Sequence, residues 1–228
     1  MREIELTAVT VEFPGRVALR DLSVRLDQQR IAVIGANGSG KSTFARTLNG
    51  LVTPTSGEVR VHGVDAVRHA RQLRRRVGFV FSNPDTQIIM PTVAEDVAFS
   101  LRGRGLSRAE IRERVADALA RVGLTEYAEA PAHTLSGGQK QLLALCAVLI
   151  GEPSLVVADE PTAYLDAANS RRIARFLLDE MPQQLVLATH DLRLAARCEV
   201  ALRFEDGRLV DHGDPGPVIA RYERDQDQ

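Results

Sequence analysis

The chain has 228 residues, of which 44% are hydrophobic and 26% are charged, as in ordinary soluble globular proteins. This length allows one large domain, or one domain with a small appended lobe. The 29 Lys and Arg residues balance 30 Asp and Glu residues, which excludes a strong overall field for nucleic acid or an anionic membrane. The longest apolar run, Leu142–Ile150, is about half of a membrane span, and we expect no signal peptide.

The N-terminal third has the alternation and turn residues of β-structure, with one helix after a glycine-rich segment. Pro14-Gly15 predicts a turn between the first two strands. The predicted strands are Ile4–Thr10, Leu19–Leu26, Ile31–Ile34, Glu58–Val61 and Val77–Phe81, and the predicted helix is Lys41–Leu48.

The middle of the chain is predicted to be helical, and the C-terminal third alternates between strands and helices as βαβ units do. Capping-box patterns at Thr92–Glu95 and Ser107–Glu110 each open a predicted helix. From Arg221 we expect a frayed polar tail. The predicted elements are the helices Ala109–Val122, Ala167–Leu178 and Asp191–Arg197 and the strands Leu155–Ala158 and Leu185–Ala188.

The two cysteines, Cys146 and Cys198, lie far apart and have no metal-ligand spacing around them. We therefore expect buried or partly buried free thiols in a reducing, cytosolic compartment.

The segment Gly35–Ser42 matches the phosphate-loop pattern between a predicted strand and a predicted helix. Its glycines let backbone N–H groups face phosphate oxygens, and the helix N-terminus adds positive potential there. We predict that Lys41 binds the β- and γ-phosphates of ATP and that the Ser42 hydroxyl binds Mg²⁺. The alternative is a glycine-rich turn without a ligand. The predicted contacts to the phosphates are Gly35, Asn37, Gly38, Ser39, Gly40, Lys41, Ser42 and Thr43.

The apolar run after Ser154 ends in two carboxylates, Asp159 and Glu160. A central strand of a parallel sheet is buried on both faces, so charges are expected only at its mouth, where ligands bind. We predict that Asp159 reaches Mg²⁺ and that Glu160 orients and polarises the attacking water. The alternative is a solvated strand end.

The pentapeptide Leu135–Gln139 reads Leu-Ser-Gly-Gly-Gln, and Ser136 and Gln139 form a capping box. A well-capped core helix is one interpretation, but it leaves the two poor helix formers Gly137 and Gly138 unexplained. Absent side chains at a positive helix end favour an anion site. The phosphate loop already has its own helix end, so we predict that this site serves a nucleotide on a second subunit.

These motifs resemble those of ABC-type ATPases, and the resemblance runs from about Ile4 to Val210. It implies an α/β P-loop NTPase fold with a RecA-like parallel-sheet core, an N-terminal antiparallel β subdomain and a helical subdomain over about 84–150. The ATPase domain would cover 1–213, with a short C-terminal helix and frayed tail over 214–228. It also implies ATP and Mg²⁺ as cofactors and a second subunit whose ATP is contacted by Ser136, Gly137, Gly138 and Gln139.

Three further residues take their expected roles from this resemblance. Asp166 matches the D-loop and joins the site for the second subunit's ATP, although Tyr164 replaces a small residue there. His190 matches the switch histidine, which contacts the γ-phosphate and helps to hold the attacking water. Phe13 falls where the family places an aromatic that stacks on adenine; taken alone, it fits a core residue equally well.

The segment Val77–Gln87 resembles energy-coupling-factor ATPases, and Ile88–Phe99 resembles biotin-uptake ATPases most closely, with cobalt and nickel versions next. The resemblance implies an ATPase homodimer or heterodimer at the cytoplasmic face of the cell membrane, without nucleic acid. The implied partners are a transmembrane coupling protein and a substrate-capture membrane protein. The implied function is uptake of a vitamin, with biotin favoured, powered by ATP-driven closure and opening of the dimer. The alternatives are a cobalt or nickel importer ATPase and a non-transport ABC ATPase.

One departure lies at Ser82, where the family has a glutamine that reaches Mg²⁺ and reports the γ-phosphate to the membrane partner. Serine is shorter, and Gln87 lies five residues later, so we assign the Q-loop position to Ser82 and hypothesise looser coupling or compensation by water. The apolar Ile88–Met90 fits either the core or the groove for a coupling helix. A solvated helix face, or contact with lipid or a partner, would explain the basic residues Arg71, Arg74, Arg75 and Arg76.

Overall fold

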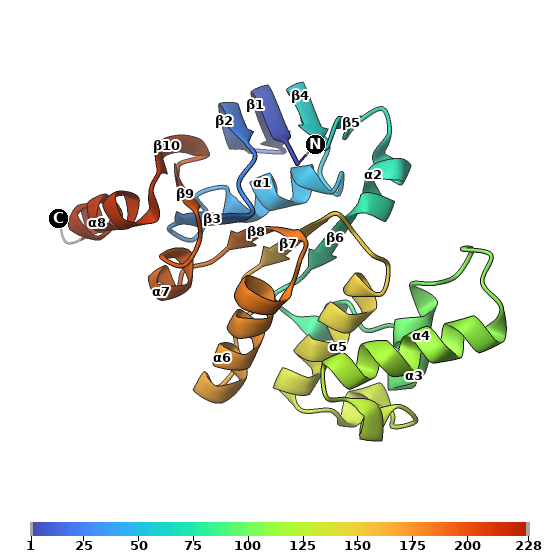
Figure 1. Ribbon diagram of the computed structural model, residues 1–228. Coiled ribbons are helices and arrows are strands. Elements are labelled where there is room, and N and C mark those ends of the chain that lie inside the picture. The colour runs from blue at the N-terminus through green and yellow to red at the C-terminus, as the bar shows by residue number, and fades with distance from the viewer. Residues whose placement is uncertain (1, 227–228) are drawn as a thin grey trace.

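The structure is a computed structural model that describes residues 2–226. Its strands form two sheets (Figure 1). The antiparallel sheet has the order β2-β1-β4-β5 and consists of β1 (Ile4–Phe13), β2 (Arg16–Leu26), β4 (Ser56–Val61) and β5 (Val64–Asp65). The larger sheet has the order β10-β9-β3-β8-β7-β6 and consists of β3 (Arg30–Gly35), β6 (Val77–Val80), β7 (Leu155–Asp159), β8 (Gln184–Ala188), β9 (Val200–Glu205) and β10 (Arg208–Gly213).

All strand pairs of the larger sheet are parallel except β9 with β10. The α-helices are α1 (Lys41–Leu48), α2 (Ala70–Arg76), α3 (Val93–Phe99), α4 (Arg108–Arg121), α5 (Gly137–Leu149), α6 (Ala167–Arg175), α7 (Leu192–Ala195) and α8 (Pro215–Gln226). Short 3₁₀ turns are η1 (Pro84–Thr86), η2 (Thr125–Tyr127) and η3 (Ala132–Thr134), and η4 (Phe176–Glu180) is π-helical.

The larger sheet separates two cores, and the residues of β3 alternate between them as strand periodicity requires. Ile31 and Val33 belong to the core shared with α1 and the antiparallel sheet. Ala32 and Ile34 belong to the core on the other side, which includes apolar residues of α5 and α6. Figure 1 accordingly shows α1 between the two sheets and α5 and α6 on the opposite face of the larger sheet. This arrangement places the phosphate-loop helix and the Leu-Ser-Gly-Gly-Gln helix on different faces.

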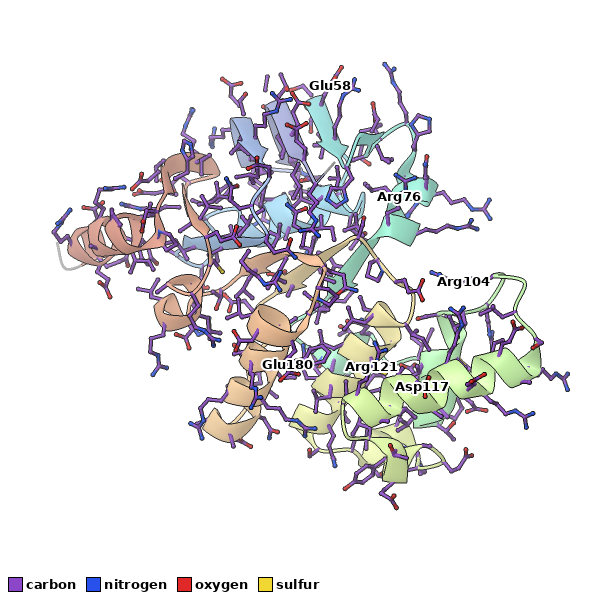
Figure 2. The ribbon with its side chains drawn as sticks, viewed as in Figure 1. Glu58, Arg76, Arg104, Asp117, Arg121 and Glu180 are labelled. Atoms are coloured by element: carbon purple, nitrogen blue, oxygen red, sulfur yellow. The ribbon has the colours of Figure 1, made fainter. Side chains whose placement is uncertain are left out.

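The chain between η1 and the end of α5 is helical and lies beside the β6 edge of the larger sheet (Figure 1). It contains the predicted helical subdomain, although the division at 84–150 stays a prediction. The two capping boxes are present, because the Thr92 and Ser107 hydroxyls accept hydrogen bonds from the Glu95 and Glu110 N–H groups. Figure 2 shows Asp117 and Arg121 on α4 and Arg104 on the loop that precedes it.

Several predicted boundaries differ from the structure. The first strand continues to Phe13, and the helix predicted through Leu178 changes from α to π geometry at Phe176. The helix predicted at Asp191–Arg197 covers only Leu192–Ala195, because Asp191 is its N-cap. The strands β5, β9 and β10 add to those predicted from the sequence.

The expectation of a frayed tail from Arg221 is wrong through Gln226, where α8 continues. Its apolar residue Val218 is fully buried, and ion pairs join Arg203 to Asp225 and Arg221 to Asp211, with N–O distances of 2.6 Å each. Packing and charge pairing together order a polar helix end that composition alone assigns to coil. Residues 227–228 of the expected tail lie outside the described residues.

The predicted free thiols are confirmed, since Cys146 and Cys198 are both unpaired and buried. Burial raises the thiol pKa of each to about 12. Among residues 2–226, no helix combines the length and the apolar character needed to cross a bilayer.

Candidate functional site

Strand β8 lies between β3 and β7, so three chain segments meet at one edge of the larger sheet. The parallel pairing of β8 with both neighbours puts their carboxyl ends at the same edge. The phosphate loop follows β3, Asp159-Glu160 ends β7, and Thr189-His190 follows β8. Ligands of open parallel sheets bind at such carboxyl ends. The topology therefore gathers into one place motifs that are more than 100 residues apart in the sequence, such as Ser42 and Asp159.

The phosphate loop has the backbone that its glycines allow. Gly35 has a φ of 144°, and a Cβ there would lie 2.2 Å from the Phe204 carbonyl oxygen, so no other residue fits. At the loop tip, Asn37 and Gly38 are exposed, whereas Ser39 is buried. Within the described residues, the buried Ser39 hydroxyl has no hydrogen-bond partner. Open N–H groups and an unpaired hydroxyl fit a polyanionic ligand.

Lys41, at the first position of α1, folds back over the loop. Its ammonium group donates hydrogen bonds to the carbonyl oxygens of Gly35 and Ala36 at 2.7 and 2.9 Å. Burial lowers the pKa of this ammonium group, and the nearby carboxylates of Glu160 and Asp159 act in the opposite direction. A buried cation beside loop N–H groups is available to an anion that enters the loop.

The Ser42 hydroxyl donates a hydrogen bond of 2.9 Å to Oδ1 of Asp159, which is buried. Both residues are predicted metal ligands, and the structure brings them together. Thr43, the last predicted phosphate contact, is half-buried next to them. Arg46, one helical turn beyond Ser42, approaches the other Asp159 oxygen at 3.9 Å. Arg46 is not among the site residues predicted from the sequence, although its i+4 spacing from Ser42 was a usable signal.

His190 and Glu160 also meet at this edge. The Nδ1 atom of His190 lies 2.8 Å from Oε2 of Glu160, and the His190 side chain is 71% exposed against 18% for Glu160. Glu160 has a φ of 52°, and its N–H donates to the Ala188 carbonyl at 2.8 Å. A glutamate in the left-handed region, fixed by the next strand, is typical of a functional turn.

The capping box predicted at the start of α5 is present. The Gln139 N–H donates to the Ser136 hydroxyl at 3.3 Å, and the Ser136 N–H donates to Oε1 of Gln139 at 2.8 Å. Gly137 is exposed and its position is open, since a Cβ would approach no closer than 3.8 Å to Leu165.

The absence of a side chain at Gly138 also has a packing explanation, which had not been predicted from the sequence. A Cβ at this position would lie 2.2 Å from the Asn169 side chain, so Gly138 allows close packing within the chain itself. Helix capping leaves Gly138 unexplained, and close packing against Asn169 is an explanation besides the predicted anion site, which stays a prediction. The signal for Asn169 was its position three residues after Asp166, the N-cap of α6.

Asp166 caps α6 by accepting hydrogen bonds from the N–H groups of Ala168 and Asn169. The Asn169 amide also donates to the Asp166 carboxylate at 2.7 Å, and these hydrogen bonds lower the pKa of Asp166. Together with the Asn169–Gly138 contact, they tie the D-loop position to the start of α5 on one surface.

Two predicted residues stand apart from this site in their contacts. Phe13 ends β1, is 37% exposed, and has the Arg16 guanidinium 5.5 Å from its ring centroid, so it is not a core residue. Ser82 is half-buried after β6, and its side chain has no hydrogen bond among the described residues. Gln87 is occupied elsewhere, because its side chain bonds to the backbone of Phe79, Phe81 and Ala144.

Helix α5 also holds the segment that contains Ser82. Lys140 forms an ion pair of 2.7 Å with Asp85, and the buried Gln141 amide donates to the Phe81 carbonyl at 3.2 Å. Thus the helix that begins with the pentapeptide is linked to the chain just before and after Ser82. These contacts depend on tertiary packing and had no local sequence signal.

The fold and the site define a P-loop NTPase with a RecA-like sheet and an added antiparallel sheet. A family model described as "ABC transporter" matches residues 19–163. The chain is 47% identical over 219 residues to a putative ABC transporter ATP-binding protein of Deinococcus radiodurans, covering 96% of both chains. The chain belongs to the ABC transporter family of ATP-binding subunits, which are transport ATPases, and the predicted fold class is confirmed.

Other relatives carry more specific names. The biotin transport ATP-binding protein BioM of Rhizobium etli is 45% identical, with 96% of this chain and 97% of the relative covered. The energy-coupling factor transporter ATP-binding protein EcfA1 of Latilactobacillus sakei is 37% identical, and the match covers 97% of this chain and 81% of the relative. The resemblance to energy-coupling-factor ATPases is confirmed by these relatives.

Two solved structures share the fold. The cbiO1 protein of Clostridium perfringens, described as part of the ABC transporter complex cbiONQ, has a TM-score of 0.85 and 31% identity, covering 98% of this chain and 93% of its own. A dimeric ATP-binding cassette in a post-hydrolysis state, bound to ADP and Pi, has a TM-score of 0.81 and 28% identity. The match covers 93% of this chain and 98% of the cassette.

Proposed function

We propose that this chain is the ATP-hydrolysing subunit of an energy-coupling-factor importer that takes up a vitamin, with biotin as the favoured substrate. The 2.8 Å contact between His190 and Glu160 beside the phosphate loop supports ATP hydrolysis, and the similarity to EcfA1 and to the biotin transport protein BioM supports the importer type and the substrate. The contact supplies a carboxylate and an imidazole at the place where a γ-phosphate would lie against Lys41. A module that only binds nucleotide has no need of this pair.

The residues at the sheet edge fit ATP and Mg²⁺. The Ser42 hydroxyl and the Asp159 carboxylate are hard oxygen donors, which Mg²⁺ prefers in combination with phosphate oxygens. Among the described residues, no cluster of three or more His, Cys, Asp or Glu side chains could hold a metal by itself, which agrees with a metal shared with the nucleotide. Mg²⁺ held there neutralises charge on the phosphates.

Side chains of this chain would then bind the phosphates and activate the attacking water. Lys41 exchanges its hydrogen bonds to the Gly35 and Ala36 carbonyls for phosphate oxygens. Glu160 accepts a hydrogen bond from the attacking water and takes its proton. His190 orients the Glu160 carboxylate and lies near the phosphate that leaves.

Two ATPase subunits would share each nucleotide. The Leu135–Gln139 signature lies at the start of α5, on the face of the larger sheet opposite α1, so the sheet separates it from the phosphate-loop helix of its own chain. A second copy or a paralogue can bring its phosphate loop to this helix end. The dimeric state of the related cassette bound to ADP and Pi supports the arrangement.

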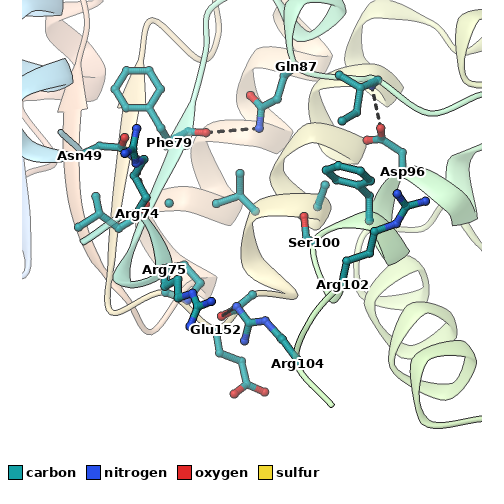
Figure 3. A pocket seen from close by; sticks show the side chains of 18 of the residues that line it. Asn49, Arg74, Arg75, Phe79, Gln87, Asp96, Ser100, Arg102, Arg104 and Glu152 are labelled. Carbon is teal, nitrogen blue, oxygen red and sulfur yellow. Dashed lines mark hydrogen bonds between the residues drawn. The ribbon is translucent and has the colours of Figure 1, made fainter. Parts of the chain in front are cut away.

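The membrane partner would bind in a groove between β6, α3 and the loop before α4, with a volume of about 1000 Å³ (Figure 3). Ile89 in this groove is 61% exposed, whereas Ile88 packs against the core. The Asp96 carboxylate holds the chain there by accepting from the N–H groups of Ile89 and Met90 at 2.9 and 3.0 Å. All four arginines of the predicted basic cluster are exposed on α2, and two of them, Arg74 and Arg75, line the groove.

The groove assignment is tested with Ile89→Asp. Co-purification with the membrane partners should be lost, because a charge replaces an exposed apolar contact, while ATP binding by the isolated chain should persist. Val67→Asp is the matched control, since Val67 is 48% exposed and does not line the groove. Equal complex formation by both variants contradicts the groove assignment.

The function is tested by reconstituting this chain in liposomes with the membrane proteins encoded beside its gene. ATP-dependent uptake of radiolabelled biotin is the expected result. Uptake of cobalt or nickel ions instead would reassign the substrate and keep the transport role. ATP hydrolysis that supports no uptake with any membrane partner would favour a non-transport ABC ATPase.

A further inference from the structure

Two neighbouring side chains of α6 contact the helical segment, which is the chain between η1 and the end of α5. Asn169 packs against Gly138 at the start of α5. Arg172, three residues further along α6, donates a hydrogen bond of 2.7 Å from its Nη2 to the Val122 carbonyl at the end of α4. Residues three apart are neighbours on a helix, about 4.5 Å apart along its axis. One side of α6 therefore contacts both the start of α5 and the end of α4.

The end of α4 is shaped to receive the guanidinium group of Arg172. The last carbonyl oxygens of a helix have no partner within the helix and carry a negative partial charge, which favours a cation there. Val122 is the C-cap of α4, and Gly123 follows it with a φ of 65°, as at many helix ends. A Cβ at Gly123 would lie 2.8 Å from Nη2 of Arg172. Glycine at this position therefore leaves room for the hydrogen bond.

Arg172 joins two elements that are otherwise separated by a cavity on this side. The cavity has a volume of about 550 Å³ and is lined by residues of α4, α5 and η4, which include Val122. Arg121 and Glu180 also line it, and Figure 2 shows them at the ends of α4 and η4. Within residues 2–226, the Arg172 contact is the one hydrogen bond between the end of α4 and α6 or η4. The position of α4 on this side therefore depends on this side chain.

The chain that connects α4 to α5 is held in place at several points. Leu124 and Leu135, near its two ends, are buried in the same core. Between them, the Ala132 N–H donates to the Pro91 carbonyl at 2.9 Å, which ties the connection to the chain that precedes α3. A displacement of the end of α4 would therefore also move the start of α5.

We propose that Arg172 is a positioning residue for ATP hydrolysis. By holding the end of α4, it sets the orientation of the signature at the start of α5 relative to Asp166 at the start of α6. The contact of Asn169 with Gly138 fixes one point and leaves rotation about it, and the contact of Arg172 restricts that rotation. The inference rests on the proposed function, in which the signature contacts a second subunit's nucleotide. A misplacement of about 1 Å at a reaction site can slow a reaction by about 100-fold.

The test compares Arg172→Met with Arg171→Met in the full chain. Methionine keeps an unbranched side chain and removes the donors. Arg171 is the matched control, because it is exposed on the same helix and its side chain has no hydrogen bond or ion pair in the described part of the chain. Arg172→Met should lower kcat about tenfold while ATP binding to the monomer persists, and Arg171→Met should keep the wild-type rate. Arg172→Lys should recover part of the loss, because its ammonium group can donate to the Val122 carbonyl.

A distance measurement reports the orientation directly. Both native cysteines are buried, so spin labels can be attached to Ala120→Cys on α4 and to Glu58→Cys on β4, which are exposed positions. Pulsed electron paramagnetic resonance then gives the distribution of distances between the helical segment and the antiparallel sheet. Arg172→Met should broaden this distribution, and Arg171→Met should leave it as in the wild type. A residue that only stabilises the fold would lower the melting temperature without broadening it.

Two results would overturn the inference alone. One is a wild-type kcat for Arg172→Met, and the other is an unbroadened distance distribution for that variant, in each case with an inactive Ser136→Ala. A Ser136→Ala variant that hydrolyses ATP at the wild-type rate would instead contradict the role of the signature in the proposed function, and the inference would fail with it.

Discussion

The imidazole Nδ1 of His190 lies 2.8 Å from the carboxylate Oε2 of Glu160, although the two residues follow different strands. The contact exists because β7 and β8 are parallel neighbours, and the Glu160 N–H donates to the last residue of β8, Ala188. In the proposed mechanism Glu160 is the base and His190 fixes its position. We therefore predict that the contributions of the two side chains to catalysis are interdependent.

Glu160→Gln and His190→Ala should each lower kcat by about 100-fold or more while ATP binding persists. The first variant removes the base that activates the water, and the second removes the side chain that orients this base. Since the two side chains act as one unit, the double variant should be little slower than the slower single variant. Steady-state hydrolysis and nucleotide binding measure this. Glu113→Gln, an exposed change on α4, is the control. Near-normal turnover of Glu160→Gln would remove Glu160 from the base role.

Ser136→Ala should abolish turnover and spare ATP binding to the monomer, since the signature would contact only the second subunit's nucleotide. The same change removes a helix cap, which costs about 1 kcal/mol of folding stability. Ser107→Ala matches that loss, because Ser107 accepts the equivalent N–H of Glu110 at 3.3 Å on α4. Hydrolysis and thermal unfolding of both variants separate the two effects. Loss of monomer binding by Ser136→Ala would contradict the shared site.

Ser82→Gln should increase the substrate transported per ATP hydrolysed, because the longer amide can reach the nucleotide without an added water. Gln87 cannot take this role, since its amide is engaged with the backbone of Phe79 and Ala144. Uptake and hydrolysis in the same liposomes give the ratio. If both rates stay at wild-type values, the identity of residue 82 is unimportant.

Cys146 and Cys198 should resist alkylation by iodoacetamide at pH 8.5 in the folded protein, because burial raises both thiol pKa values to about 12 from a reference of 9.0. The folded state therefore keeps protons that the unfolded state releases above pH 9. This contribution to stability is complete below pH 9 and is lost as the pH rises toward 12. Mass spectrometry after labelling checks the resistance to alkylation, with the exposed Ala120→Cys thiol as the reactive control. Rapid labelling of the native thiols would contradict their burial.

Much of the fold could be predicted from the sequence because its local patterns agree with its tertiary contacts. The phosphate-loop strand and helix match Arg30–Gly35 and Lys41–Leu48, and the capping boxes open α3, α4 and α5 as predicted. The errors lie where long-range contacts decide. Helix α8 stays ordered past Arg221 through ion pairs to β9 and β10, which no local window contains.

The sequence by itself determined the chemistry of this protein, because phosphate-binding glycines, a lysine, a serine and strand-end carboxylates have few other uses in that order. Only the tertiary structure decided how these groups meet. Parallel pairing of β8 with β3 and β7 places Ser42 against Asp159 and Glu160 against His190. Tertiary packing also explains why residue 138 is glycine, since the Asn169 side chain packs against it, and it leaves Tyr164 exposed. These properties depend on distances in space, which the spacing of residues along the chain does not encode.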